Sequence, residues 1–363
     1  MDGLATMYVC GITPYDATHL GHAATYLTFD LLNRVWRDSG VEVSYVQNVT
    51  DIDDPLLERA VQTGQDWRVI AQRETELFFS DMTALRVIPP QVYESAVESI
   101  PDVVELIQQL PQSAAYLVDS DWYFHSDAVG AVCGWSRTQM QQTFAQRGGD
   151  PQRPGKRDPL DSLLWRAERE GEPSWSGALG SGRPGWHIEC VAIALRHLQA
   201  PLTVQGGGRD LLFPHHDMCN AQVKALTGQS LAQAYVHAGL IGYQGEKMSK
   251  SLGNLVLVSQ LRANGVSMSA LRLALAEGHY RDDREWTQAV LERGETRLAL
   301  WTAHAEVAVD SILADVRTAL RNDLDTDTAM QIIDQRCRES DSRTVVGEVL
   351  LRDLADSLFG VQI

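Results

Sequence analysis

The chain has 363 residues, of which 31 are Lys or Arg and 48 are Asp or Glu, so its net charge is −17. This length predicts two or three domains, and an apolar fraction of 44% excludes an intrinsically disordered protein. No apolar run approaches the roughly 20 residues of a membrane span, and no basic segment typical of a signal peptide is present. Five scattered cysteines exclude a disulfide framework and favour a reducing, cytoplasmic location.

The first part of the chain predicts a strand, a helix and a second strand. Residues 7–12 form a short apolar run that predicts a buried strand, and residues 21–38 carry apolar side chains at helical spacing. Residues 41–47 are the next predicted strand. This order and spacing predict a βαβ unit, whose functional edge lies at the carboxyl ends of its strands.

The middle of the chain predicts two helical stretches, an insertion and a second α/β half. The helical patterns cover residues 56–86 and 95–110. Residues 111–185 look different, with short strand candidates at 114–118 and 122–124 and loops rich in Gly and Pro. We interpret this region as an insertion into a nucleotide-binding fold. The second half then comprises a helix (186–198), a strand (202–205), a glycine loop (206–208), a second helix (215–226) and a second strand (235–241). From residue 268 onward the pattern is helical.

The first predicted helix begins at the motif His19-Leu-Gly-His22. A helix N-terminus offers unpaired N–H groups and the positive end of the helix dipole, which favour a phosphate. Two imidazoles there can donate hydrogen bonds to a phosphate that gains charge in its transition state. Taken alone, however, a His-x-Gly-His sequence is more often accidental.

A second motif, Lys247-Met-Ser-Lys-Ser251, contains half of the four lysines of the chain. It lies in a loop between Gly245 and Gly253, which can close on a triphosphate and stabilise departing pyrophosphate. The plainer alternative is a solvated surface loop. The two motifs in this order make that alternative less attractive than it would be for either motif alone.

Together, these motifs resemble the catalytic core of class I aminoacyl-tRNA synthetases. Further segments resemble cysteinyl-tRNA synthetase, up to about residue 285: Tyr8-Val-Cys-Gly11, Thr50-Asp-Ile-Asp-Asp54, Gly185-Trp-His-Ile-Glu-Cys190, Gly206-Gly-Gly208 and Phe213-Pro-His-His216. The resemblance implies an α/β fold with a Rossmann-like catalytic core, an insertion domain and a C-terminal helical domain. The expected parts are 1–90 (first half of the core), 91–185 (connective insertion), 186–245 (second half), 246–285 (the lysine-motif loop and connecting region) and 286–363 (helical domain).

Cys10, Cys190 and His215 come from three distant segments of the chain. Scattered Cys and His residues are by themselves more often buried packing residues, but in the resembled family these positions hold a zinc ion that binds the thiolate of substrate cysteine. Zn²⁺ favours thiolate and imidazole and keeps an open position at working sites. Serine cannot form that bond equally well, so selection could occur without editing. Cys219 stands where the tRNA synthetases have a further ligand, a glutamate, and it is either a fourth ligand or a small neighbour.

Other features resemble the cysteine ligases of mycothiol biosynthesis, which join cysteine to glucosaminyl-inositol. Pro14 and Ala24 differ from the usual synthetase residues, and Gln146-Arg-Gly-Gly-Asp-Pro151 is close to an element of this branch, which has Glu for Gln146. Residues 276–363 contain 10 arginines, no lysine and 18 acids, and so lack the positive surface that an anticodon-binding module needs. Arg209 departs from the small residue that the branch has at this position.

This resemblance implies ligation of L-cysteine to the amine of glucosaminyl-inositol through a cysteinyl-adenylate, with ATP converted to AMP and pyrophosphate. It implies one zinc ion per chain, Mg²⁺ with the ATP, and His19, His22, Lys247 and Lys250 as catalytic residues. The implied adenylate contacts are Cys10, Gly11, Ile12, Thr13, Thr25, Asn48, Val49, Thr50, Trp186, Gly208, Arg209, Asp210, Ile241 and Lys250. We expect a monomer without nucleic-acid or membrane partners. The alternatives are a cysteinyl-tRNA synthetase and a catalytically silent nucleotide-binding or zinc-dependent interaction protein.

Overall fold

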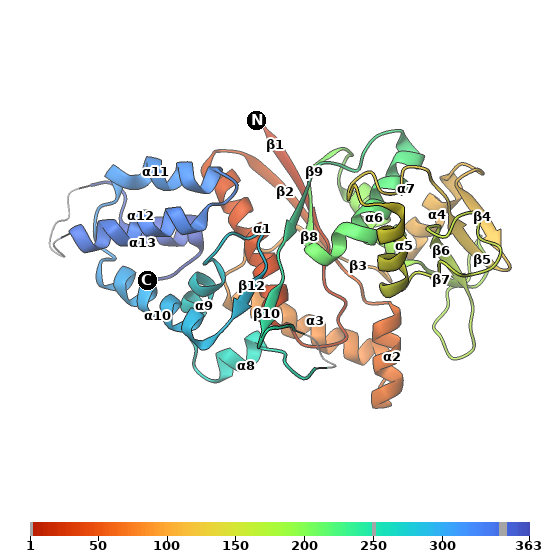
Figure 1. The fold of residues 1–363 in the computed structure, drawn as a ribbon, viewed down its shortest axis with the longest axis horizontal. Helices are drawn as coiled ribbons and strands as arrows, with labels where there is room; N and C mark the ends of the chain where they lie inside the picture. The colour runs from red at the N-terminus through yellow and green to blue at the C-terminus, as the bar shows by residue number, and fades with distance from the viewer. Residues whose placement is uncertain (1–2, 249–251, 341–346) are drawn as a thin grey trace.

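The computed structural model describes residues 3–248, 252–340 and 347–363. A five-stranded parallel sheet in the order β3-β2-β1-β8-β9 forms its centre (Figure 1). Its strands are β1 (Leu4–Val9), β2 (Glu42–Val49), β3 (Val92–Ser95), β8 (Leu202–Gly208) and β9 (Ala232–Ala238). The middle strand β1 pairs with both neighbours, so that Met7 lies opposite Tyr45 and Val204. Met7 is fully buried because helices cover both faces of the sheet.

Helices from both halves of the core cover the two faces. Apolar side chains of α1 and α3 pack together with those of α9 in one cluster, and those of α4, α6 and α7 form a second cluster. The bounds of these helices, with α2, are α1 (Leu20–Asp38), α2 (Asp54–Thr63), α3 (Trp67–Ala84), α4 (Ile100–Gln109), α6 (Trp186–His197), α7 (Asp217–Thr227) and α9 (Met268–Leu275). The predicted βαβ order of the first half is therefore confirmed.

Two predicted strands differ from the observed ones at their ends. The strand expected at 7–12 ends at Val9, and the following residues turn across the carboxyl edge of the sheet, where Thr50 N–H donates to Ile12 O at 2.9 Å. The strand expected at 235–241 is divided into β9, which ends at Ala238, and β10, which begins at Ile241. In both places, residues that we expected in a strand lie instead in a loop at the carboxyl edge of the sheet.

The insertion is a four-stranded antiparallel sheet in the order β4-β5-β6-β7, together with α5 (Arg137–Gln146). Its strands are β4 (Ala115–Val118), β5 (Asp121–Phe124), β6 (Ser162–Ala167) and β7 (Gly182–Pro184). The strand candidates at 114–118 and 122–124 correspond to β4 and β5, whereas β6 and β7 carried no sequence signal that we used. Residues 92–95, which we expected in the insertion, form β3 of the central sheet.

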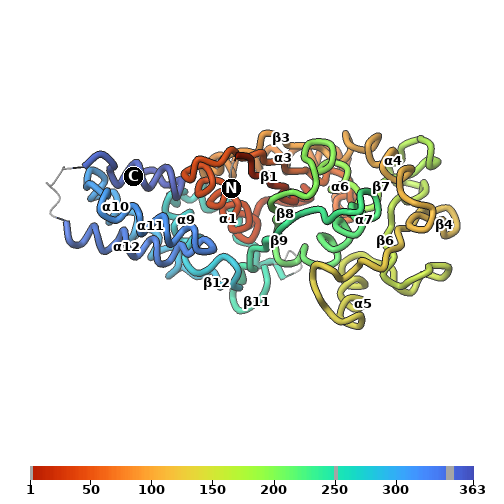
Figure 2. Tube along the Cα trace, turned by 90° about the horizontal axis from the view of Figure 1, so that it is seen from above, coloured from red at the N-terminus to blue at the C-terminus, as the bar shows by residue number. Residues whose placement is uncertain are grey.

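The C-terminal part begins with a small sheet and continues as helices at the end of the molecule opposite to the insertion (Figures 1 and 2). The small sheet comprises β10 (Ile241–Tyr243), β11 (Glu246–Lys247) and β12 (Arg284–Trp286). The remaining helices are α8 (Val258–Ala263), α10 (Gln288–Ala303), α11 (Asp310–Arg321), α12 (Thr326–Glu339) and α13 (Leu351–Leu354). In the described ranges, no helix combines the length and the hydrophobicity needed to cross a bilayer.

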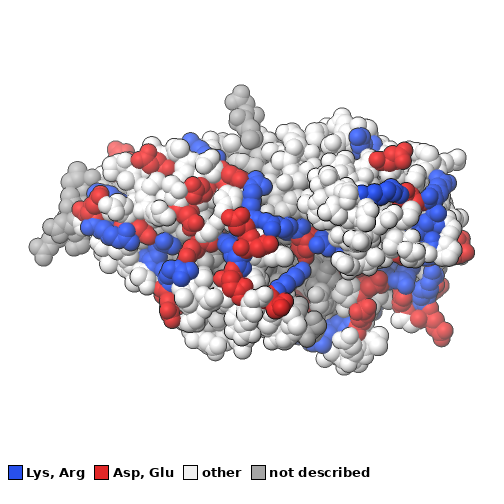
Figure 3. All heavy atoms as spheres, viewed as in Figure 1, with Lys and Arg blue, Asp and Glu red and all other residues white. Residues whose placement is uncertain are grey.

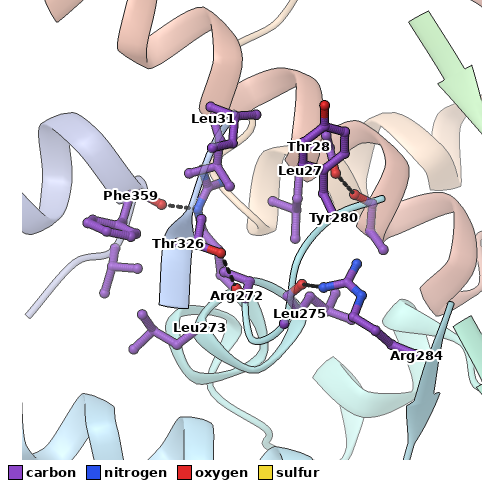
Figure 4. A pocket seen from close by; sticks show the side chains of 15 residues that line it. Leu27, Thr28, Leu31, Arg272, Leu273, Leu275, Tyr280, Arg284, Thr326 and Phe359 are labelled. Carbon is purple, nitrogen blue, oxygen red and sulfur yellow. Dashed lines mark hydrogen bonds between the residues drawn. The ribbon is translucent and has the colours of Figure 1, made fainter. Parts of the chain in front are cut away.

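The end of the chain returns to α1. The Arg34 guanidinium donates to the carbonyl oxygens of Asp356 and Ser357 at 2.8 and 3.2 Å, and buried Arg272 pairs with Asp30 and donates to Phe359 O. A small apolar cavity of about 20 Å³ remains at this joint, as Figure 4 shows. It has room for about one water molecule, so we regard it as a packing gap rather than a binding site.

Candidate functional site

A cavity of about 390 Å³ opens at the carboxyl ends of β1, β2, β8 and β9. Ligands of open α/β sheets bind at this edge. The structure brings most of the predicted site residues to this cavity; those that line it are Cys10, Gly11, Ile12, Thr13, His19, His22, Thr25, Asn48, Thr50, Trp186, Cys190, Gly208, Asp210, His215, Ile241 and Lys247. Segments that are far apart in the sequence thus form one chamber.

Three predicted site residues are not placed in the cavity lining. Val49 is buried in β2, and the Arg209 side chain extends away from the cavity toward Asp283, with Nη1 3.0 Å from Asp283 Oδ2. Lys250 lies outside the described residues. The other lysine of its motif, Lys247, lines the cavity, with its Nζ 3.9 Å from Asp210 Oδ2.

His19 and His22 meet at the N-terminus of α1. The Gly21 N–H donates to His19 Nδ1 at 3.0 Å, and the two imidazole rings stack with centroids 3.9 Å apart. Burial lowers the pKa of His19 to about 3 and that of His22 to about 4, so both rings are neutral near neutral pH. Each neutral ring still carries one N–H donor. His22 Nδ1 is buried and has no hydrogen-bond partner among the described residues.

Gly11 allows the turn after β1 to pass directly over the end of β2. Its N–H donates to Asn48 Oδ1 at 2.8 Å, and Asn48 Nδ2 donates in turn to Thr50 Oγ1 at 2.9 Å. A Cβ atom at position 11 would lie 1.5 Å from the backbone oxygen of Asn48, so no side chain fits there. The close approach of the two strand ends shapes the floor of the cavity.

Cys10, Cys190 and His215 form a buried group whose ligand atoms all lie within 4.8 Å of one another. Cys10 follows β1, Cys190 lies in the second turn of α6, and His215 lies in the short helical turn Leu212–His216 that leads into α7. All three also line the cavity. Two thiols and an imidazole are a donor set that Zn²⁺ prefers, and contact with the cavity leaves room for a further ligand from a substrate. The three residues therefore lie together, and their donor set is one that fits a zinc ion.

Neighbouring aromatic rings hold His215 in place. Trp186 stacks on it with a centroid separation of 4.4 Å, and His187 Nδ1 lies 3.1 Å from His215 Nδ1. This contact leaves His215 Nε2 as the nitrogen available to a metal. Cys219 lies 3.8 Å from that nitrogen but outside the group of three, and its thiol is also 3.4 Å from His187 O.

Several cavity residues were missed by sequence reasoning: Tyr15, Asp16, Ala17, Tyr26, Leu211, Ala238, Gly239, Leu240 and Leu255. Tyr26 lies one helical turn after His22, so the helical period could have identified it. The segment from Ala238 to Leu240 carried no usable signal, because only the pairing of strands shows that β9 ends there. Leu255 reaches the cavity through a loop that follows the lysine motif.

Acidic and basic side chains alternate on the surface of the C-terminal helices. On the face drawn in Figure 3, and among the described residues, Asp and Glu are interspersed with Lys and Arg over these helices. Several form pairs, such as Arg317 with Asp38 at 2.7 Å and Arg293 with Glu277 at 2.8 Å. This face thus presents a mixed surface rather than a continuous basic one.

Comparisons with known proteins show which family the chain belongs to. The family model of the tRNA synthetases class I (C) catalytic domain matches residues 1–296. A Nocardia farcinica protein named L-cysteine:1D-myo-inositol 2-amino-2-deoxy-alpha-D-glucopyranoside ligase is 55% identical over 99% of this chain and 91% of its own length. A ligase of the same name from Mycolicibacterium vanbaalenii is 57% identical over 91% of this chain and 80% of its own.

The chain belongs to the class I (C) tRNA synthetase family and groups with these ligases. Among solved structures, Mycobacterium tuberculosis methionyl-tRNA synthetase in complex with methionyl-adenylate is similar, with a TM-score of 0.69. The match covers 92% of this chain and 82% of that one at 16% identity, so it bears on the fold alone. The α/β class I synthetase fold predicted from the sequence is confirmed.

Proposed function

We propose that this protein is a ligase that joins L-cysteine to the amine of glucosaminyl-inositol, using ATP, in mycothiol biosynthesis. The observation that carries the proposal is the group Cys10, Cys190 and His215 in the same cavity as the phosphate-binding motif at the start of α1. A site for a thiol next to a site for a nucleotide suits the activation of cysteine. The ligases named above, at 55% and 57% identity, support the sugar amine as acceptor.

In the first step, a carboxylate oxygen of cysteine attacks the α-phosphorus of ATP, and the bond to the bridging oxygen of pyrophosphate breaks. The products are cysteinyl-adenylate and pyrophosphate. His19 and His22 are suited to donate hydrogen bonds to the phosphates, and Lys247 together with Lys250 is suited to attract the departing pyrophosphate. No protein nucleophile is required, because positioning and charge stabilisation are sufficient for this chemistry.

In the second step, the neutral amine of glucosaminyl-inositol attacks the carbonyl carbon of cysteinyl-adenylate. The amide bond forms, the bond from the carbonyl carbon to the AMP oxygen breaks, and the amine nitrogen loses a proton. AMP leaves with one more negative charge on its phosphate than the adenylate carried, which balances the proton that the amine releases to solvent. Trp186, stacked on His215, would form a wall of the cysteine pocket and help to keep water from the activated carbonyl.

Cys10, Cys190 and His215 would hold the zinc ion that the donor set fits. When bound, zinc would supply a Lewis-acidic site at which the thiol of cysteine ionises more readily than a hydroxyl does. Serine, with its hydroxyl, would bind more weakly at such a site, so the selection of cysteine would follow from the donor set. We further propose that Mg²⁺ accompanies ATP, that the chain acts as a cytoplasmic monomer, and that it needs no nucleic acid.

The test is to supply the purified protein with ATP, cysteine and either glucosaminyl-inositol or tRNA. Mass spectrometry should detect the cysteinyl amide of the sugar, formed together with AMP and pyrophosphate. Charging of tRNA without sugar ligation would instead support a cysteinyl-tRNA synthetase. Absence of cysteine-dependent exchange between pyrophosphate and ATP would support a catalytically silent protein and contradict the proposal.

A further inference from the structure

Arg209 stands between two residues of the nucleotide cavity without itself lining it. Gly208 and Asp210 both face the cavity, whereas the Arg209 guanidinium reaches the loop that precedes β12. Its Nη1 lies 3.0 Å from Asp283 Oδ2, and its Nη2 donates to Arg281 O. The side chain therefore connects the end of β8 with a segment more than 70 residues later in the chain.

Asp283 also contacts the segment that follows the neighbouring strand β9 and lines the same cavity. Its second oxygen, Oδ1, accepts a hydrogen bond of 2.8 Å from the Leu240 N–H. Leu240 lines the cavity, and its carbonyl accepts from Arg284 N–H at 2.9 Å. One carboxylate thus joins the strand end that carries Asp210 to the loop between β9 and β10.

This connection is anchored at both ends. Arg281 forms two hydrogen bonds with Asp323, of 2.7 and 2.8 Å, which tie the loop to the turn between α11 and α12. On the other side, Arg147 of the insertion donates to the carbonyl oxygens of Asp210 and Phe213. The backbone around Asp210 is therefore held from two directions.

We propose that Arg209 and Asp283 are positioning residues that fix the cavity-lining backbone around Asp210 relative to the cavity-lining segment at Leu240. The inference rests on the proposed use of ATP, but not on the identity of the acceptor. The two side chains are 43% and 57% exposed, so their charge attraction is screened and contributes little to folding. The bridge acts on ATP affinity through Asp210 and Leu240 rather than on chemistry or on overall stability.

The test compares Arg209→Met, Asp283→Asn and the double variant with the parent. Calorimetry with a non-hydrolysable ATP analogue should show Kd raised about two- to fivefold in each single variant. The double variant should be no weaker than the weaker single variant, because both changes remove the same bridge. Arg209→Lys, which keeps the charge opposite Asp283, should recover part of the affinity.

Arg196→Met is the matched control. Arg196 is 47% exposed and pairs with Asp102 at 2.7 Å, and neither residue lines the cavity. The variant therefore removes a comparable surface ion pair at a site away from the cavity. The Kd of Arg196→Met for the ATP analogue should equal that of the parent. In every variant, the KM for cysteine and the zinc content should also equal those of the parent. The inference would be overturned if Arg209→Met left the Kd for the analogue unchanged. It would also be overturned if the variant weakened ATP binding, raised the KM for cysteine and lowered the melting temperature together, as a general structural defect would. A parent that binds the analogue but forms no cysteinyl amide would instead contradict the proposed function.

Discussion

The three candidate metal ligands are attached to backbone that has little freedom to move. Cys10 N–H donates to Gly206 O at 3.0 Å, Cys190 lies within α6, and the His215 ring packs against the rings of both Trp186 and His187. Side chains held in this way are preorganised for a ligand, so binding requires little rearrangement. Removing one of them should abolish the metal site without disturbing the surrounding fold.

Cys190→Ser should therefore lose zinc and cysteine activation together. We expect a fall on the order of 100-fold or more in cysteine-dependent exchange of pyrophosphate into ATP, because a hydroxyl is a poor zinc ligand. Metal content by mass spectrometry and the exchange rate provide the measurement. Cys133→Ser, in the insertion and outside the group of three, is the control and should keep both. Parent-level exchange in metal-free Cys190→Ser would refute the zinc assignment.

The two buried histidines at the N-terminus of α1, His19 and His22, predict a dependence of stability on pH. Burial lowers the pKa of His22 to about 4, whereas an unfolded histidine titrates near 6.5. In this window the unfolded state binds more protons than the folded state, so the free energy of unfolding falls as the pH falls. In His22→Gln, the melting temperature should decrease less between about pH 7 and about pH 5 than in the parent. Identical slopes in both proteins would contradict the lowered pKa.

The turn between β1 and α1 is the element that assembles most of the cavity. It carries Cys10 toward the metal group, passes Gly11 over Asn48 and delivers His19 to the helix start. The strand ends can approach this closely only because position 11 lacks a Cβ. The turn is thus sensitive even to the addition of one methyl group at position 11, which changes neither its charge nor its polarity.

Gly11→Ala should be strongly destabilising, by about 3 kcal/mol or more, because its Cβ would overlap the Asn48 carbonyl. Urea denaturation followed by circular dichroism measures the loss. Gly177→Ala is the control: its Cβ would meet only Val104 methyl groups at 3.9 and 4.0 Å, so its stability should remain within about 0.5 kcal/mol of the parent. Equal stabilities of the two variants would show that the turn can relax.

At the scale of the complete chain, the C-terminal helices are joined to the catalytic core through buried charges. Arg272 of α9 pairs with Asp30 of α1 and also donates to Leu85 O at 2.7 Å. Asp30 additionally accepts from Arg34 at 2.8 Å, and Arg34 contacts the chain end. These contacts are made by α1, the helix that begins next to His19, so the C-terminal part supports that helix.

Arg272→Met should cost about 3–5 kcal/mol of unfolding free energy, because it leaves Asp30 buried with one partner fewer. Arg293→Met removes a comparable pair with Glu277 in which Arg293 is 52% exposed, and should cost less than about 1 kcal/mol. Chemical denaturation of both variants provides the comparison. A cost for Arg272→Met as small as that for Arg293→Met would mean that the joint does not depend on this pair.

Much of the fold and the site follows from local signals in the sequence. Periodic apolar residues predict α1, and the apolar run at 7–12 predicts β1 because a central parallel strand is buried on both faces. The motifs at His19 and Lys247 are recognisable since phosphate chemistry needs those side chains at a loop or helix start. Cys10, Cys190 and His215 were predicted to meet only because the family resemblance supplied the topology.

Other features depend on contacts between distant segments, which no local pattern records. Strands β6 and β7 exist because each finds a partner in the insertion sheet, and the three residues Gly182–Pro184 have no strand signal of their own. The neighbours of Arg209 in the sequence line the cavity, yet its side chain points to Asp283 because that carboxylate lies across the loop. The sequence alone thus specified the chemical groups and the order of the elements. Packing decided which side chains face the cavity and which brace its walls, because direction and distance arise only when the segments fold together.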